Sequence, residues 1–572
     1  MGGTLAQYRK SFVDAVAQSL GQPAAEVDAQ VKPAADPAHG DFSFATFALA
    51  KALRKAPPAI AAEAAKAIAV PGLEVKATGP YVNARILAMP FTREVIDSVR
   101  TAGAKYGDGE SGKGKTMVID YSSPNIAKPI AFHHIRSTAI GHAIANLYRF
   151  QGWRVEGINY LGDWGKQFGL VAVGFKEYGD PARADDVGHL VEVYVKASKR
   201  AEAEPEFDAR ARDFFRKMEA GDAEALATWQ QFRQTSLEDF KKVYARLGIE
   251  FEHYEGESRY QGKMDAVIEA IAQTVGTKVS DGALIVDMPY AEGEPPVLLK
   301  KNDGSTLYAT RDLAAAIDRY ERFNFTRSLY VVAADQSLHF RQFFAVLEAM
   351  GKPWAKRCTH VAFGRVKGMS TRKGNLEMLS GVLDEAHARA FEVVEANIKE
   401  GRIDTLDADG LAEQIGVGAV IFGDLKNRRV TDYEFDWEQV LKFEGHTGPY
   451  LQYAHARACN ILVKGGGCPV SFEPHLLALP EEQALVREVA RFPQVTFEAA
   501  EANEPSVVAR FLLDLAAAFS RWYTLGNQQR EHRVLIEDNP GLRAARLALT
   551  DTVRVTLHNG LHLLGVATPE KM

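Results

Sequence analysis

The stretch from residue 117 to residue 169 constrains the fold of this chain most, because it alternates apolar runs with loops that contain proline and glycine. Residues 117–121 are apolar and predict a buried strand, and residues 154–160 predict a second one. A polar loop and a helical pattern, from about 132 to 151, lie between them. This order predicts the first unit of a parallel nucleotide-binding sheet, which binds ligands at the carboxyl ends of its strands. We therefore expect the segment from Ser122 to His134 to lie at the ligand site.

The sequence motifs in this stretch are specific. It contains SSPNIAKP from residue 122, IRST from residue 135 and NYLGDWGKQFG from residue 159. These motifs resemble the signature region of arginyl-tRNA synthetases, class I enzymes that activate arginine with ATP and load it onto tRNA. GDFSFATFALAK and GPYVN near the start, and residues 551–572 at the end, match the same family. The resemblance covers essentially the full length.

The resemblance implies an α/β fold, in which the Rossmann-type parallel sheet of a class I synthetase is split by an insertion. An α+β domain precedes it and an all-α anticodon-binding domain follows. The expected parts are an N-terminal tRNA-contacting domain (1–110), the first half of the catalytic domain (111–180), a connective insertion (181–290), the second half with an MSTRKG loop (291–376) and the α-helical anticodon-binding domain (377–572).

Local patterns predict further elements. We expect helices at 4–20 and around 41–69, strands at 73–86 with a turn at Gly79–Pro80, charged helices at 180–250, strands at 282–288, 296–300, 328–334 and 359–366, and almost no strand after residue 376.

Composition is ordinary for a soluble globular protein. At 572 residues, the chain is too long for one core, so three or four domains are expected. A net charge of −6 gives no general attraction to nucleic acid, so RNA contacts need local basic patches. The three cysteines do not have metal-ligand spacing, and we expect neither zinc nor disulfides. Without a signal pattern or an apolar run of ~20 residues, a cytoplasmic protein with no membrane partner is expected.

The signature departs from the family at its "HIGH" element, which usually reads His-x-Gly-His. Here the second histidine is His134, but the first is Ala131 and the glycine is His133. The family's histidines donate to ATP phosphates, so the loss of one removes ~1.5–3 kcal/mol, or about 10- to 150-fold in rate. On a regular helix, 131 and 134 share a face and 133 does not, so His133 is not expected to replace the missing side chain.

The class I "KMSKS" element takes the form MSTRKG at residues 369–374. Cations on a mobile loop can neutralise charge as pyrophosphate leaves. Gly368 and Thr371 stand where the pattern has lysine, whereas Arg372 and Lys373 remain nearby. The resemblance implies that Lys128 compensates.

Recognition of a guanidinium needs carboxylates placed for paired hydrogen bonds and an aromatic or apolar wall. Tyr308 and Asp312 are four residues apart and share one helix face. Without the resemblance, a buried tyrosine and a surface aspartate would be the default interpretation. The resemblance implies an arginine pocket formed by Asn125, Glu257, Tyr308, Asp312 and Gln336.

The segment GPYLQYAHARA begins at residue 448. By resemblance, Tyr450, Gln452, Tyr453 and Arg457 contact tRNA, since unpaired bases are read by stacking and by hydrogen bonds to their edges. The same side chains can instead fill a helix interface, and for each one taken singly core packing is the commoner state.

The predicted function is that of an arginine–tRNA ligase, with tRNA(Arg), L-arginine and ATP with Mg²⁺ as partners, no DNA, and a monomeric state. The alternative is a catalytically impaired paralogue that binds tRNA or arginine. The expected catalytic residues are His134, Lys128, Arg136, Arg372 and Lys373. The expected ATP-binding residues are Ser122, Pro124, His133, His134, Gly162, Asp163, Met369 and Ser370.

Overall fold

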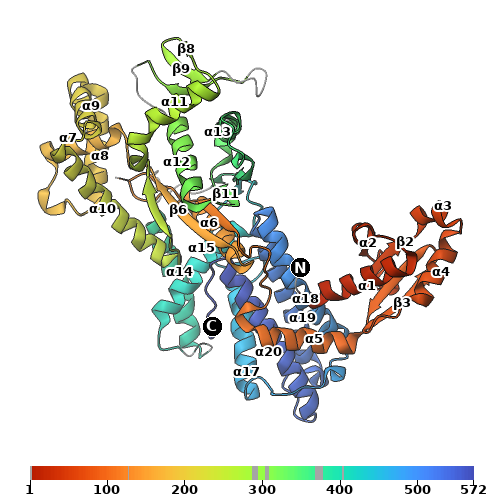
Figure 1. The fold of residues 1–572 in the computed structure, drawn as a ribbon. Coiled ribbons are helices and arrows are strands. Elements are labelled where there is room, and N and C mark those ends of the chain that lie inside the picture. Colours follow the sequence, from red (N-terminus) through yellow and green to blue (C-terminus); the bar gives the residue numbers. More distant parts are fainter. Residues whose placement is uncertain are drawn as a thin grey trace.

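The structure is a computed structural model that describes residues 3–126, 128–286, 294–302, 308–367, 378–401, 403 and 405–572, without the side chains of Pro37 and Tyr308. A central parallel sheet forms the middle of the molecule, with helices above and below it in the view of Figure 1. The N-terminal domain projects to one side and contacts the C-terminal helices through α1 (Thr4–Leu20) and α5 (Ala88–Ala102).

The central sheet has five parallel strands in the order β12-β11-β5-β6-β7. They are β5 (Thr116–Asp120), β6 (Arg154–Leu161), β7 (His253–Gly256), β11 (Arg327–Tyr330) and β12 (Cys358–His360). The chain order along the sheet reverses between β5 and β11, and in open α/β sheets the ligand crevice lies outside the strand ends at such a point. The predicted strands at 117–121 and 154–160 are confirmed.

Helices follow or precede these strands as a doubly wound sheet requires. They are α6 (His134–Phe150), α7 (Lys166–Tyr178), α12 (Tyr308–Phe323) and α13 (Ser337–Ala349). The apolar run of β5 is buried on both faces, which is why it reads as continuous rather than alternating. The helix predicted after the loop is confirmed, but it starts only at His134.

The N-terminal domain packs helices against an antiparallel sheet of order β1-β2-β4-β3. Its elements besides α1 and α5 are α2 (Ala24–Gln30), β1 (Lys32–Pro33), β2 (Phe42–Ala45), α3 (Ala50–Leu53), α4 (Pro57–Ala67), β3 (Leu73–Thr78) and β4 (Tyr81–Ile86). The prediction of a helical region from residue 41 is wrong for β2. Phe42 and Phe44 alternate with more exposed residues and bury their rings, so a strand hides both.

The insertion is largely helical, as its charge pattern predicts. It contains α8 (Val187–Ala203), α9 (Pro205–Glu219) and α10 (Ala223–Arg246). β7, within the range 181–290, nevertheless belongs to the central sheet. After it come α11 (Met264–Thr274) and a small antiparallel sheet of β8 (Lys278–Ser280), β9 (Ala283–Val286) and β10 (Val297–Lys300). The part of the predicted strand at 282–288 that lies beyond Val286 falls outside the described residues.

Two predicted strands of the second half are shorter than expected. β11 ends at Tyr330, and the segment at 359–366 divides between β12 and β13 (Val366–Lys367). β13 pairs in parallel with β14 (Tyr433–Glu434), a strand contributed by the C-terminal part of the chain. This separate two-stranded sheet ties the segment after β12 to the C-terminal part of the chain.

The C-terminal part is helical, as predicted. Its helices are α14 (Leu379–Lys399), α15 (Ala408–Leu425), α16 (Trp437–Val440), α17 (Gly448–Gly465), α18 (Pro480–Ala502), α19 (Ser506–Gln528) and α20 (Pro540–Leu563). Thr447 caps α17 and Asn539 caps α20, each followed by an early proline. Within the described ranges, we find no helix with the length and apolarity to cross a membrane.

Candidate active site

A cavity of about 960 Å³ opens at the carboxyl ends of β5 and β11, where the strand order reverses. Its polar lining comes from the loop after β5, from the start of α6, from α12 and from the segment after β11. Predicted site residues that line the cavity are Ser122, Asn125, His133, His134, Arg136, Gly162, Glu257, Asp312 and Gln336. The structure therefore brings these predicted residues together around one cavity.

Hydrogen bonds to side chains of α6 and α10 hold the loop after β5. Ser122 and Ser123 have φ angles of 70° and 48°, a region that non-glycine residues rarely adopt. The Ser122 amide donates to Ser137 Oγ at 2.9 Å, and its hydroxyl lies 2.8 Å from the hydroxyl of Tyr244. Backbone strain of this kind persists where the surroundings enforce it, which is common at functional sites.

Gly162 lies where two chain segments approach each other closely. Its amide donates to the Pro124 carbonyl at 3.1 Å, and a Cβ at position 162 would lie 1.9 Å from Asn125 Oδ1. Pro124 is buried behind this contact and is not among the described cavity-lining residues. Asn125 is exposed at the cavity, as the arginine-pocket prediction requires.

Asp163 corrects a prediction. Its side chain is fully buried and accepts hydrogen bonds from the amide and the hydroxyl of Ser258, each at 2.8 Å. Arg233 adds an ion pair at 2.8 Å. The carboxylate therefore fixes the segment that follows β7. It is not available to bind ATP, which was its predicted role.

Two acidic side chains face the cavity from opposite elements. Glu257 follows β7 and pairs with Arg311 at 3.2 Å, while Asp312 of α12 lies 2.6 Å from Nε2 of His339. Burial raises the pKa of Glu257 to about 7, against the opposing charge of Arg311. Tyr308 begins α12, but its side chain lies outside the described part of the structure.

A buried ion pair supports the floor of the cavity. Arg319 of α12 contacts Asp120, the last residue of β5, at 2.7 Å, and its guanidinium lies over the rings of Tyr160 and Tyr330. Ser123 also donates to Asp120 at 2.8 Å. Sequence reasoning did not select Asp120, although an acidic residue at the carboxyl end of a predicted strand was a signal for it.

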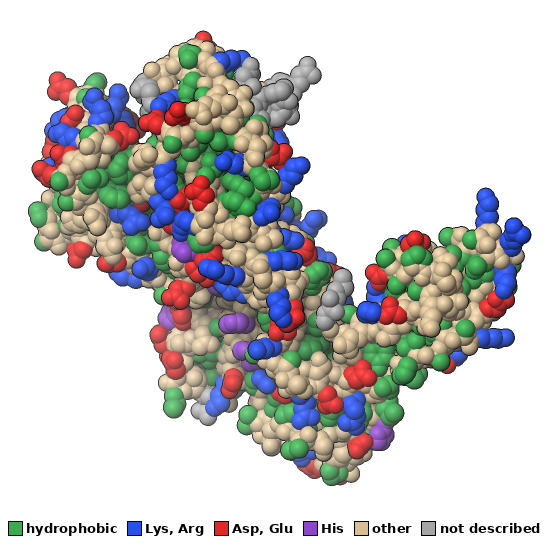
Figure 2. All heavy atoms as spheres, in the orientation of Figure 1, with side chains coloured by type: hydrophobic (Ala, Val, Ile, Leu, Met, Phe, Trp, Pro, Cys, Tyr) green, Lys and Arg blue, Asp and Glu red, His purple; other side chains and the backbone are tan. Residues whose placement is uncertain are grey.

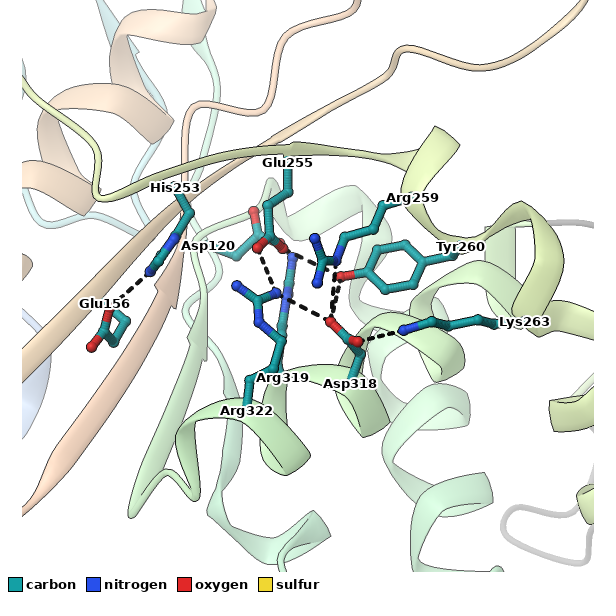
Figure 3. Close-up of polar contacts among 10 residues, drawn as sticks. All are labelled: Asp120, Glu156, His253, Glu255, Arg259, Tyr260, Lys263, Asp318, Arg319 and Arg322. Atoms are coloured by element: carbon teal, nitrogen blue, oxygen red, sulfur yellow. Dashed lines mark hydrogen bonds and ion pairs between the residues drawn. The ribbon is translucent and has the colours of Figure 1, made fainter.

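Next to this pair, an ionic network joins α12 to the segment after β7 (Figure 3). Asp318 is 8% exposed and accepts from Lys263, Arg322 and Arg259. Arg322 also contacts Glu255 of β7. The network holds the segment that contains Glu257 against the helix that contains Asp312.

The cations that were predicted to lie near the ATP phosphates are paired, lie away from the cavity or fall outside the described residues. Arg136 lines the cavity but is 1% exposed and paired with the buried Asp424 at 2.9 Å. Lys128 is exposed, and its ammonium lies 4.9 Å from the ring centroid of Tyr194 in α8. It is not among the described residues that line the cavity, which differs from the expected role beside the phosphates. Met369, Ser370, Arg372 and Lys373 lie outside the described residues.

Three of the four predicted tRNA-contacting residues leave atoms accessible. Tyr453 is 37% exposed, and the Arg457 guanidinium lies 4.6 Å from its ring centroid. Tyr450 is half-buried. Gln452 corrects the prediction, because it is fully buried and donates to the carbonyls of Gln414 and Ala567, both at 2.9 Å.

Comparison with known proteins agrees with this architecture. Residues 96–437 match the family described as tRNA synthetases class I (R), catalytic domain. The fold and the site therefore define a class I tRNA synthetase. Residues 6–86 match the arginyl tRNA synthetase N-terminal domain, and residues 451–572 match the DALR anticodon binding domain.

Individual relatives narrow the class further. The chain is 42% identical to an arginine–tRNA ligase of Exiguobacterium, over 99% of this chain and 100% of that one. It is also 42% identical to an arginine–tRNA ligase of Alkaliphilus metalliredigens, over 93% and 94%. The arginyl-tRNA synthetase structure of Thermus thermophilus superimposes with a TM-score of 0.80 at 26% identity, over 99% and 100%. The chain belongs to the arginyl-tRNA synthetase family.

Proposed function

We propose that this protein activates L-arginine with ATP and transfers it to tRNA(Arg). The observation that carries the proposal is the position of Glu257 and Asp312 in the same cavity as the start of α6. Two carboxyl groups suit a guanidinium, and a helix N-terminus suits a phosphate. One cavity can thus hold both reactants of an adenylation.

In the proposed reaction, a carboxylate oxygen of arginine attacks the α-phosphorus of ATP, and pyrophosphate leaves. A terminal ribose hydroxyl of tRNA then attacks the arginyl carbonyl and AMP leaves. The protein contributes position and charge stabilisation and needs no nucleophile of its own. Asn125 and Gln336 line the same cavity and supply amide groups to the amino acid.

Mg²⁺ is proposed to enter with the nucleotide. Within the described ranges, there is no group of three or more His, Cys, Asp or Glu side chains that could hold a metal ion. The ATP phosphates themselves are suitable ligands, because Mg²⁺ commonly binds through substrate phosphates and retains water. The ion would neutralise phosphate charge during the attack.

The shape of the molecule supports the RNA part of the proposal. Figure 2 shows a wide concave face between the N-terminal domain and the body of the molecule, with acidic and basic side chains mixed along its edges. Tyr453 and Arg457 offer an aromatic ring and a cation to bases. A monomeric state, a cytoplasmic location and the absence of DNA partners stay predictions.

Arginine-dependent exchange of labelled pyrophosphate into ATP tests the activity, with and without tRNA. We expect exchange that needs arginine and is stimulated by tRNA, and none with lysine. Asp312→Asn is expected to abolish the exchange, because it removes one charge from the guanidinium site. An inactive protein that still binds tRNA would instead establish the impaired paralogue.

A further inference from the structure

His133 lies in the cavity even though a regular helix would turn it away. Residues 131–133 precede α6, which begins at His134. His133 already has helical backbone angles (φ −61°, ψ −20°), whereas Ala131 pairs with Met378 in a bridge, so the spacing of a regular helix does not extend back to Ala131. His133 and His134 both line the cavity, with ring centroids 4.2 Å apart. The expectation that His133 faces away is therefore wrong, because the regular helix does not extend back to Ala131, whose backbone is held in a bridge to Met378.

Ala131 has a different position. Its backbone pairs with Met378 in an antiparallel bridge, and its carbonyl accepts from the amide of His134 at 3.0 Å. It is not among the described residues that line the cavity. The family signature has a histidine at position 131. Ala131 therefore lacks the imidazole and is also not among the described residues at the cavity.

The charged side chains of the cavity wall already have partners. Arg136 pairs with Asp424 at 2.9 Å, and Arg365 pairs with Asp335 at 2.6 Å. His339 is committed to Asp312. None of these three side chains is free to meet an incoming triphosphate without breaking an existing contact.

His134 is limited in another way. Its Nδ1 lies 3.1 Å from the Ala131 carbonyl, which can only accept, so this nitrogen carries the ring proton. Burial, with the nearby His133, lowers the pKa of His134 to about 4, so the ring is neutral at pH 7. Nε2 of the neutral ring is then an acceptor and cannot donate to a phosphate oxygen.

His133 has no such restriction. Its side chain is exposed in the cavity, and its ring nitrogens have no hydrogen-bond partner within the described part of the chain. A neutral imidazole always carries one N–H donor, whichever tautomer it adopts. His133 is also the N-cap residue of α6, where the helix dipole favours an anion.

We propose that His133 donates a hydrogen bond to the ATP phosphates during adenylation, in the role that the residue at position 131 cannot fill. The proposal rests on the proposed function. The hydrogen bond strengthens as charge develops on the departing pyrophosphate, so the side chain stabilises the transition state more than the bound substrate. It replaces the family's glycine with a donor instead of blocking the nucleotide.

Two substitutions distinguish a hydrogen-bond donor at position 133 from a side chain that only fills space. His133→Gly restores the family residue and removes the donor, whereas His133→Phe keeps a ring of similar size without a donor. We expect both variants to lower the turnover of arginine-dependent pyrophosphate exchange by about 10- to 100-fold, as for the loss of one charge-assisted hydrogen bond. The KM for arginine is expected to stay within about twofold, since Glu257 and Asp312 are unchanged.

Each contrary outcome has a distinct meaning. A Gly variant as active as the parent, or more active, would overturn the proposal and show that His133 obstructs the nucleotide. A Phe variant with parental activity would overturn it in favour of a packing role. His475→Ala, at an exposed histidine of the helical domain, is the matched control with parental activity expected. If the unmodified protein shows no pyrophosphate exchange, the proposed function is refuted, whatever the variants do.

Discussion

Asp312 and His339 form a pair across the cavity wall, with 2.6 Å between the carboxylate and Nε2 of the imidazole. Asp312 lies on α12 and His339 on α13, one on each side of β11 in the sequence. The histidine fixes the direction of the carboxylate that we propose binds arginine. It is therefore a positioning residue that the sequence alone did not reveal.

His339→Ala is expected to raise the KM for arginine by about 5- to 10-fold and to leave the KM for ATP nearly unchanged. A hydrogen bond to a charged group is worth ~1.5–3 kcal/mol, and part of this acts on the ligand through Asp312. Steady-state exchange kinetics with each substrate varied in turn measures the split. Equal changes in both constants would contradict a role confined to the guanidinium site.

Arginine binding is expected to weaken as the pH falls from 8 to 6. Because burial raises the pKa of Glu257 to about 7, the free protein takes up a proton there below pH 7, and a neutral carboxyl group does not pair with a guanidinium. Well below pH 7, the KM for arginine should rise by about tenfold per pH unit. Calorimetry in two buffers of different ionisation enthalpy should detect proton release on binding at pH 6.5. Glu257→Gln should bind more weakly at pH 8 and lose this release; an unchanged release would assign the proton to another group.

The raised pKa of Glu257 also affects stability in a defined direction. The folded protein favours the neutral form, so this group stabilises the fold below its ordinary pKa, and the contribution is lost as the pH rises toward 7. Thermal melting between pH 5 and pH 8 should therefore show a smaller loss of stability for Glu257→Gln than for the parent. A larger loss would contradict the assignment.

Asp318→Asn is expected to lower the free energy of unfolding by ~1–3 kcal/mol and to raise the KM for arginine. Burial opposes ionisation of Asp318, but hydrogen bonds from Lys263 and Arg322 outweigh it and lower its pKa. The low end of the range is favoured because Arg259 and Lys263 are 43% and 49% exposed and can be hydrated again. Denaturant unfolding measures the stability change. In the parent protein, the stabilisation contributed by ionised Asp318 should disappear as the pH falls through the lowered pKa of this group.

Asp265→Asn is the matched control for Asp318→Asn. Asp265 also pairs with a lysine, Lys300, but its side chain is 87% exposed, and exposed pairs contribute little to stability. Both the unfolding free energy and the KM for arginine should stay close to the parental values. A similar loss in the two variants would show that the network in Figure 3 has no special role.

Tyr453 and Gln452 are neighbours in α17 with opposite expected effects. Tyr453→Ala should weaken tRNA binding by ~1–3 kcal/mol, the value of one stacked base, without a change in melting temperature. Gln452→Ala should lower the melting temperature instead, because the carbonyls of Gln414 and Ala567 lose their donor. Filter binding of tRNA and calorimetric melting distinguish the two. Weaker tRNA binding by Gln452→Ala at full stability would restore the sequence-based interpretation.

The sequence by itself determined the fold class, the order of the domains and the location of the cavity. The apolar run of β5 and the polar loop after it are local features, and parallel strands place their ligand at one edge of the sheet. The four-residue spacing of Tyr308 and Asp312 is likewise local, and α12 confirms that both lie on one helix. The resemblance to the family added the prediction that this cavity binds arginine.

The tertiary structure alone decided which polar side chains are free. Asp163 is committed to Ser258 and Gln452 to Ala567, partners 95 and 115 residues away in the sequence. His133 lines the cavity on a different face from that expected because Ala131, two residues before it, is held by a bridge to Met378 and not in the helix. A buried polar group must find a hydrogen-bond partner, and the fold supplies that partner from a distant segment. Whether a polar residue binds a substrate or the protein itself therefore depends on contacts that no local pattern contains.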